Sequence, residues 1–183
     1  MGKVAELYKQ LLIELEGQIR PGTLETPERV ERAWAEMLDG YKVDIPGLFK
    51  KFDGEGLDQI VAARSIPFVS FCEHHLLIFE GVAHVAYLPS DCAVGASKLA
   101  RIVIAYAHRL QIQERMTEQI AHTIEQYLHP RGVAVIIEAK HSCMSCRGVR
   151  AVGAEFITSI MLGRFRDNES SRLEVLSLLG LKC

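Results

Sequence analysis

The feature of this sequence that most constrains its fold is a long helical pattern, from Ser97 to about Tyr127, between two pairs of strand-like segments. Apolar residues recur in it at helical spacing, at Leu99, Ile102, Val103, Tyr106, Leu110, Met116, Ile120, Ile124 and Leu128. The flanking segments are rich in Val, Ile, Phe and Tyr, and we expect strands over residues 58–72, 81–89, 133–143 and 155–162. Because an amphipathic helix must bury its apolar stripe, this order predicts an α+β fold, with helices covering one face of a mostly antiparallel sheet.

Further helical patterns lie outside this central arrangement. Apolar residues at helical spacing predict helices over residues 3–19, 26–38 and 170–179. Residues 41–56 contain Pro46 and several glycines and are expected to form a connector. We therefore expect an N-terminal helical segment over residues 1–40 and one larger domain over residues 41–183.

Charge and hydropathy exclude several classes of protein. The formal net charge is −2, whereas nucleic-acid binders usually carry a basic surplus, so no nucleic-acid partner is expected. No run of about 18 apolar residues occurs, and the N-terminus lacks the apolar core of a secretory signal, so neither a membrane partner nor secretion is expected. The five cysteines are odd in number and widely spaced, which favours reduced thiols and a cytoplasmic location.

Two segments hold Cys and His close together: "FCEHHLLIF", residues 71–79, and "KHSCMSCRG", residues 140–148. Cys72 and His75 have the Cys-x-x-His spacing with which a tight turn brings thiolate and imidazole onto one zinc ion. Cys143 is the strongest candidate for a third ligand, which would leave one position for water. A closed structural site that adds Cys146 as a fourth ligand also has plausible spacing. These cysteines and histidines could equally be ordinary buried side chains that bind no metal. Spacing alone leaves these alternatives open.

The remaining histidines of these segments suit proton transfer. Neighbouring side chains on a strand or helix point in different directions, so His74 and His75 are not expected to do the same job. His74 and His141 would stay off the metal, and an unperturbed histidine pKa near 6.5 lets them move protons. Zinc lowers the pKa of its bound water to about 7, so this set suits hydrolytic attack on a carbon atom.

Cations and one polar interruption point to a nucleotide. Ser97 is expected to cap the long helix, and Lys98 and Arg101 share a face at this end, where free N–H groups also attract anions. Arg147, Arg29 and Arg32 are further cations. They would suit a triphosphate, or they are solvated surface charges. The segment "LQIQERMTEQ" interrupts the helical pattern, which indicates a helix surface or a break between two helices. In a pocket, its Glu114 would accept two N–H bonds from a guanine edge and reject adenine.

These motifs together resemble a known family. "CEHHL", "AHVAYLP", "GASKLARIV", "QERMTEQI" and "RGVAVIIEAKHSCMSCRGV" occur in the order found in GTP cyclohydrolase I. "TPERVERAWAEMLDGY" resembles the N-terminal helical signature of that family, and "MLGRFRD" resembles its C-terminal segment. The resemblance runs from about Thr26 to Leu179, and an ordered set of this length is highly specific.

The resemblance implies a fold, a reaction and an assembly. The fold is the tunnelling fold, an antiparallel sheet with helices on one face, assembled as a homo-oligomeric toroidal decamer with sites at subunit interfaces. The reaction is the zinc-dependent hydrolysis of GTP to 7,8-dihydroneopterin triphosphate and formate. Zinc-activated water attacks C8 of guanine, and ring opening and an Amadori-type rearrangement follow.

The resemblance also assigns residues by motif position. The Zn²⁺ ligands fall on Cys72, His75 and Cys143, and the catalytic residues fall on His74, His141 and Ser97. Guanine recognition falls on Glu114 with Gln113, and triphosphate binding falls on Lys98, Arg101, Arg147, Arg29 and Arg32. Cys146 departs from the family pattern, in which a residue that does not bind metal is usual, and so do Ile78 and Glu80.

Overall fold

The computed structural model describes residues 2–53 and 56–181. Contacts divide the chain into two compact units, Met1–Asp39 and Gly40–Cys183. The first unit is a pair of helices, α1 (Lys3–Glu16) and α2 (Thr26–Met37), joined through a short 3₁₀ helix, η1 (Pro21–Thr23). Tyr8 and Trp34 pack edge to face between the two helices, with ring centroids 5.4 Å apart.

The second unit is built on a five-stranded sheet. The strand order is β5 (Leu110–Gln111), β2 (Val61–Cys72), β3 (Leu77–Leu88), β6 (Gly132–His141) and β7 (Phe156–Gly163). Every pairing is antiparallel except that of β5 with β2, which is parallel and joins only two residues of each strand. A second, two-stranded sheet pairs β1 (Lys51–Asp53) with β4 (Cys92–Val94), after η2 (Asp39–Lys42) and α3 (Ile45–Leu48).

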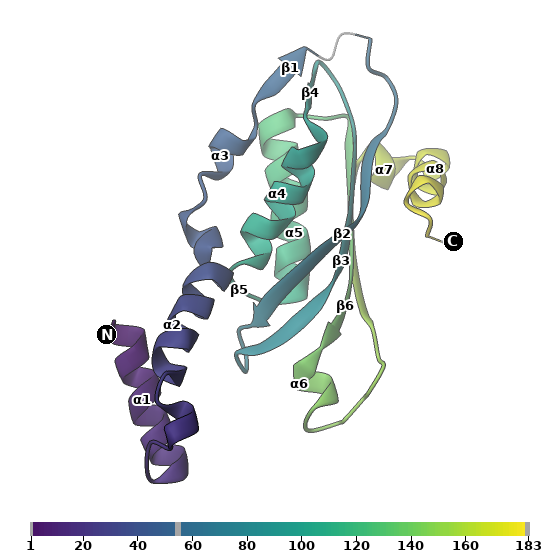
Figure 1. Ribbon diagram of the computed structural model, residues 1–183. Coiled ribbons are helices and arrows are strands. Elements are labelled where there is room, and N and C mark those ends of the chain that lie inside the picture. The colour runs from purple at the N-terminus through teal and green to yellow at the C-terminus, as the bar shows by residue number, and fades with distance from the viewer. Residues whose placement is uncertain (1, 54–55, 182–183) are drawn as a thin grey trace. The chain divides into compact units, whose positions relative to one another are not determined.

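Two helices, α4 (Ala96–Ala107) and α5 (Gln113–Leu128), cover one face of the sheet (Figure 1). Their apolar stripes are buried against the inward side chains of β3 and β6 in the main hydrophobic core. The prediction of one continuous helix over residues 97–127 is wrong, and the alternative of a break between two helices is confirmed. The break lies where Leu110 and Gln111 leave the helical path to pair with Phe71 and Cys72.

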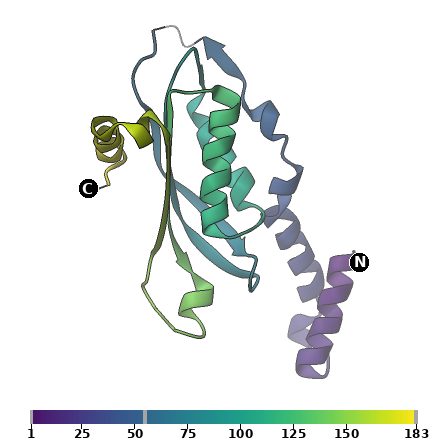
Figure 2. The ribbon, with the colours of Figure 1, turned by 180° about the vertical axis from the view of Figure 1, so that it is seen from behind.

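The opposite face of the sheet is covered at one end by α7 (Arg164–Asp167) and α8 (Glu169–Leu179), as the reverse view shows (Figure 2). Phe165, Val175 and Leu179 form a second buried cluster there with Ala86, Leu88, Ala134 and Ile136. β3 and β6 are therefore buried on both faces at this end, which explains why residues 133–137 read as a continuous apolar run.

The predicted α+β class is confirmed, and the arrangement agrees with the tunnelling fold that the resemblance implied. The expectation that helices cover one face of the sheet holds for α4 and α5, whereas α8 lies on the other face. β3 begins at Leu77 rather than at residue 81, so only residues 73–76 connect β2 to β3. Within the described residues, no helix has the length and apolar character needed to cross a bilayer.

Candidate active site

The first half of the site is the tight turn between β2 and β3. Cys72 pairs with Leu77 across the hairpin, and the carbonyl oxygen of Cys72 accepts hydrogen bonds from the backbone N–H groups of His75 (3.3 Å) and Leu76 (2.8 Å). This closed turn buries the Cys72 side chain and leaves His74 and His75 exposed. The two imidazole planes differ by 85°, as expected for neighbours that point in different directions.

The second half of the site follows β6. The strand ends at His141, and Cys143 lies in the single-turn helix α6 (Ser142–Ser145). Because Phe79 of β3 pairs with His141 of β6, the sheet register brings this segment alongside the hairpin turn. The ligand atoms of Cys72, His141 and Cys143 all lie within 4.8 Å of one another.

This group of side chains has the composition of a zinc site. Two thiols and one imidazole are ligands that zinc prefers, and three protein ligands leave a position open for chemistry. Burial and the neighbouring thiol of Cys72 raise the pKa of the Cys143 thiol. A divalent metal would stabilise both sulfur atoms as thiolates and offset the repulsion between their negative charges, so these residues fit the ion.

His75 and Cys146 lie outside that group of three. The Nη1 atom of Arg147 lies 3.0 Å from Nε2 of His75, and because arginine only donates, this imidazole nitrogen accepts the bond. The side chain of Cys146 is exposed. The structure thus brings His141 to the two thiols, whereas the Cys-x-x-His spacing had indicated His75.

A small cavity of about 160 Å³ gathers several of the predicted residues. Six of them, from four different elements and the hairpin turn, line it together with three apolar side chains. These residues are Cys72, His74, Gln113, Glu114, His141 and Cys143, with Ile112, Met144 and Phe156. Predicted residues separated by up to 71 positions in the chain (Cys72 to Cys143) therefore share one site.

The orientation of His141 is set by Gln113. The amide nitrogen of Gln113 donates to the carbonyl oxygens of Ile137 and Phe156, at 2.9 Å each, so the amide oxygen is the atom that faces the imidazole. His141 therefore donates through Nε2, at 2.8 Å, and its Nδ1 is left to accept a proton or bind a metal. The ring stacks on Phe79, with centroids 4.6 Å apart and an interplanar angle of 5°. Burial lowers the pKa of His141, against the smaller opposing effect of the Glu114 carboxylate, so the imidazole is neutral at pH 7.

Several predicted residues do not line this cavity within one chain. Ser97, Lys98 and Arg101 lie in the first half of α4, and the predicted cap is wrong because Gly95 holds the N-cap position. The C-terminal end of α4, at Ala107, leads into β5 beside Cys72. At 1.5 Å per residue, Lys98 lies about 14 Å from that end along the helix axis. Arg29 and Arg32 are exposed on α2 in the first unit, where Arg29 pairs with Glu25 at 2.6 Å.

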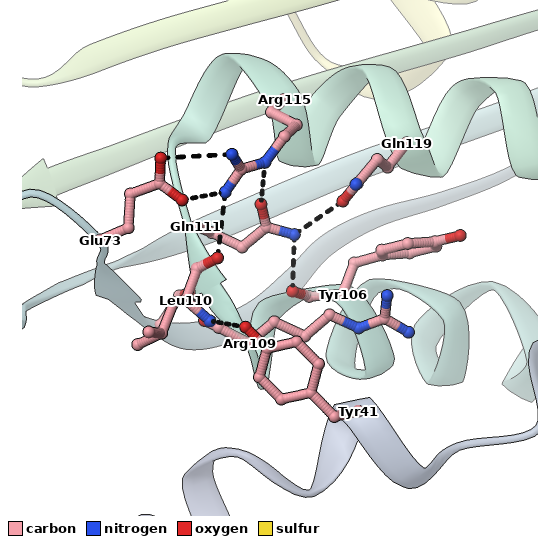
Figure 3. A network of polar contacts seen from close by, with 9 residues as sticks. Tyr41, Glu73, Tyr106, Arg109, Leu110, Gln111, Arg115 and Gln119 are labelled. Carbon is pink, nitrogen blue, oxygen red and sulfur yellow. Dashed lines mark hydrogen bonds and ion pairs between the residues drawn. The ribbon is translucent and has the colours of Figure 1, made fainter.

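A polar network beside the cavity was missed by sequence reasoning (Figure 3). The guanidinium of Arg115 on α5 forms a two-pronged ion pair with Glu73 of the hairpin turn. These hydrogen bonds hold the pKa of the Glu73 carboxyl below its usual value. The two residues are separated by 42 positions, so no spacing pattern connects them, and only their position next to Cys72 and Glu114 could have marked them.

Comparisons with known proteins show the family to which this chain belongs. A family model described as GTP cyclohydrolase I matches residues 4–180. A protein named GTP cyclohydrolase 1 from Rhodopirellula baltica is 52% identical over 161 residues, which cover 88% of this chain and 70% of that relative. Relatives of the same name from Thermoanaerobacter pseudethanolicus (49% identical, 89% of this chain and 87% of the relative) and Streptococcus thermophilus (46%, 97% and 96%) are also similar. The chain therefore belongs to the GTP cyclohydrolase I family.

Proposed function

We propose that this chain hydrolyses GTP to 7,8-dihydroneopterin triphosphate and formate, at a Zn²⁺ site formed by Cys72, His75 and Cys143. Membership of the family makes the chain an enzyme with GTP cyclohydrolase activity, and the proposal adds the metal, the residues and the steps. The observation that carries it is the single cavity that gathers two thiols, two histidines and the carboxylate of Glu114.

The ligand set is supported by the hairpin turn. Cys72 and His75 lie in one closed turn, and Nε2 of His75 already directs its lone pair at a cation, the guanidinium of Arg147. With Cys143 as the third ligand, His141 stands next to the metal without being needed to hold it. Zinc, when bound, acts as a Lewis acid that lowers the pKa of a water molecule to about 7 and so supplies hydroxide at neutral pH.

Proton transfer falls to the two remaining histidines. His141 is neutral at pH 7, and its bond to Gln113 keeps Nδ1 free, so it accepts a proton or delivers one at a fixed place. Opening of the imidazole ring of guanine requires a proton on the departing ring nitrogen and leaves a formamide. A second water hydrolyses this formamide, so that formate leaves and the amine takes up a proton. Ribose opening and the Amadori-type rearrangement need further transfers, for which His74 lines the same cavity.

Base recognition falls to Glu114. Its carboxylate is exposed on the second residue of α5 and lines the cavity beside His141. Ionised, it accepts two parallel N–H bonds, which the guanine edge offers and adenine does not. The adjacent Gln113 contributes by holding His141 rather than through a free side chain of its own.

We further propose that a neighbouring subunit completes the site, within a toroidal decamer. Ligand pockets usually measure about 300–1,000 Å³, so a cavity of about 160 Å³ is too small for GTP. The triphosphate-binding role of Lys98 and Arg101, with Ser97, requires them to reach a site on another copy, since they lie along α4 from their own. Arg147 stands beside His75 in the same chain, and Arg29 and Arg32 would add further charge. β7 and residues 61–70 of β2 have open edges among the described strands, which favours sheet pairing between copies.

The proposal is tested by incubating the purified protein with GTP and zinc. Formate release and the fluorescence of the oxidised pterin product are measured together. Cys143→Ala should lose both zinc and turnover, whereas His141→Ala should keep zinc and lose most of the turnover. Retained metal with full activity in Cys143→Ala, or wild-type turnover in His141→Ala, would overturn the assignment.

Base recognition has its own test. Glu114→Ala should weaken binding of GTP and abolish the preference for GTP over ATP, measured by competition for the active site. Glu118→Ala, an exposed glutamate one turn further along α5, is the matched control and should leave the preference intact. An unchanged preference in Glu114→Ala would refute the role of its carboxylate.

A further inference from the structure

We infer that Glu73 and Arg115 are a pair of positioning residues, which fix the hairpin turn of Cys72, His74 and His75 against the first turn of α5. The two turns carry different parts of the proposed chemistry: the metal ligands and a proton carrier on one, the base-reading Glu114 on the other. The inference rests on the proposed function and adds the contact that holds the proposed metal ligands at a constant distance from Glu114.

The pair has the geometry of a specific contact. Nη1 of Arg115 donates to one carboxylate oxygen of Glu73 at 3.2 Å, and Nη2 donates to the other, so both prongs of the guanidinium are used (Figure 3). Two parallel bonds fix the direction of approach as well as the distance, which a single ion pair does not. The side chains remain only partly exposed, at 38% for Arg115 and 33% for Glu73.

The Arg115 side chain is also held by contacts other than the one with Glu73. Its Nε donates to the side-chain oxygen of Gln111 at 3.2 Å, and its Nη2 also donates to the carbonyl oxygen of Leu110 at 3.1 Å. Gln111 is buried, and its amide nitrogen donates to the carbonyl oxygen of Tyr106 (3.1 Å) and to Gln119 (2.8 Å). Ordinary surface ion pairs contribute little because two long side chains must be ordered, and here the guanidinium is ordered already.

The hairpin turn depends on this contact for its position. Its own backbone bonds, from His75 and Leu76 to Cys72, close the turn but do not orient it toward α5. Glu73 supplies that link through its side chain, which reaches Arg115 on α5, while its backbone N–H donates to the carbonyl oxygen of Gln111 in β5 at 3.0 Å. Glu73 is adjacent to Cys72 and His74, and Arg115 is adjacent to Glu114, so the link is one residue from the chemistry at both ends.

The consequence of loosening this link is a misplaced substrate rather than an unfolded protein. A displacement of about 1 Å between reacting groups can cost on the order of 100-fold in rate. Removing a partner that orients metal ligands typically costs about 10–100-fold in metal affinity or activity. Because Glu73 does not touch the ligand atoms themselves, we expect the lower end of that range.

The test uses Glu73→Gln, which keeps the size and removes the charge, Arg115→Lys, which keeps the charge and removes the fork, and the double variant. Zinc affinity is measured by competition with a chromophoric chelator, ligand geometry from the visible spectrum of the cobalt-loaded protein, and kcat and KM with GTP. We expect each single variant to bind zinc about tenfold more weakly and to lose about tenfold in kcat. We expect the double variant to lose no more than the larger single effect, because one shared interaction is removed.

The control is Glu125→Gln, which breaks the exposed pair with His122 (3.0 Å) further along the same helix. It should leave zinc affinity, the cobalt spectrum and kcat as in the wild type. The inference is overturned if Glu73→Gln matches the wild type in all three readouts, or if the control changes them equally. A wild-type protein that neither binds zinc nor converts GTP would refute the proposed function, and this inference with it.

Discussion

Replacing Gln113 with leucine tests whether one buried amide orients the imidazole of His141. Gln113 is 1% exposed, and its side chain bonds to His141 and to the carbonyl oxygens of Ile137 and Phe156. Gln113→Leu keeps the volume and leaves one N–H group and two carbonyl groups without this partner. An unpaired group costs about 1–3 kcal/mol when it is buried, as at the Ile137 carbonyl, and less at the partly buried contacts with Phe156 and His141. Allowing for the apolar contacts that leucine gains, we expect a loss of about 2–4 kcal/mol in the free energy of unfolding.

The measurement is thermal unfolding together with turnover. For a chain of this length, about 2–4 °C per kcal/mol converts that loss into a drop of about 4–16 °C in the melting temperature. Turnover should fall about 10–100-fold, because the imidazole is no longer held as the Nε2–H tautomer. Gln126→Leu, at an exposed position of the same helix, is the control for the substitution itself. Wild-type turnover in Gln113→Leu would refute the orienting role, even if the melting temperature falls.

Three further predictions concern stability. Burial is the main cause that lowers the pKa of His84 from 6.5, so as the pH falls below 6.5 the unfolded chain takes up a proton that the folded protein resists. Stability should therefore fall in that range by up to about 1.4 kcal/mol per pH unit, and His84→Gln should remove this part of the slope in urea titrations at pH 5.5 and 7.5. Gly81→Ala should destabilise the sheet by more than about 4 kcal/mol, seen as a loss of folded protein, because the new Cβ would lie 1.9 Å from the Glu138 carbonyl oxygen. Phe165→Ala should cost about 3–5 kcal/mol in denaturant titration, because this ring is fully buried between α8 and the sheet.

The sequence predicted the parts of the fold that periodicity determines. Helical spacing identified α4 and α5 from residues such as Leu99 and Ile120, because one face of each helix is buried and the other is solvated. The pattern alone suggested one helix, because apolar residues continue at helical spacing on both sides of Leu110. The break arises because Leu110 pairs with β2 and is therefore extended. The start of β3 was misplaced because burial alternates over residues 77–80, whereas the sequence does not: Ile78 is exposed but apolar, like Leu77 and Phe79.

The site was predictable where chemistry follows local spacing. Cys72 and Cys143 were singled out by their histidine neighbours, and the structure brings both thiols together. The Glu73–Arg115 pair could not be found this way, because it is created by the register of distant elements rather than by a motif. The distance of Lys98 from the cavity was likewise hidden, since it depends on the direction in which α4 runs along the sheet.

The pairing of β3 with β6 also has a consequence for the order of folding. β2 with β3, and β6 with β7, are hairpins that close over short stretches of chain, whereas β3 and β6 are separated by both large helices. Local pairings generally form before distant ones, because a long loop costs more entropy to close. One hairpin carries Cys72, and the other carries His141 and Cys143, so neither hairpin alone contains all three side chains of the candidate metal site. Metal capture should therefore come late in folding, and its rate would report when the two halves of the sheet join.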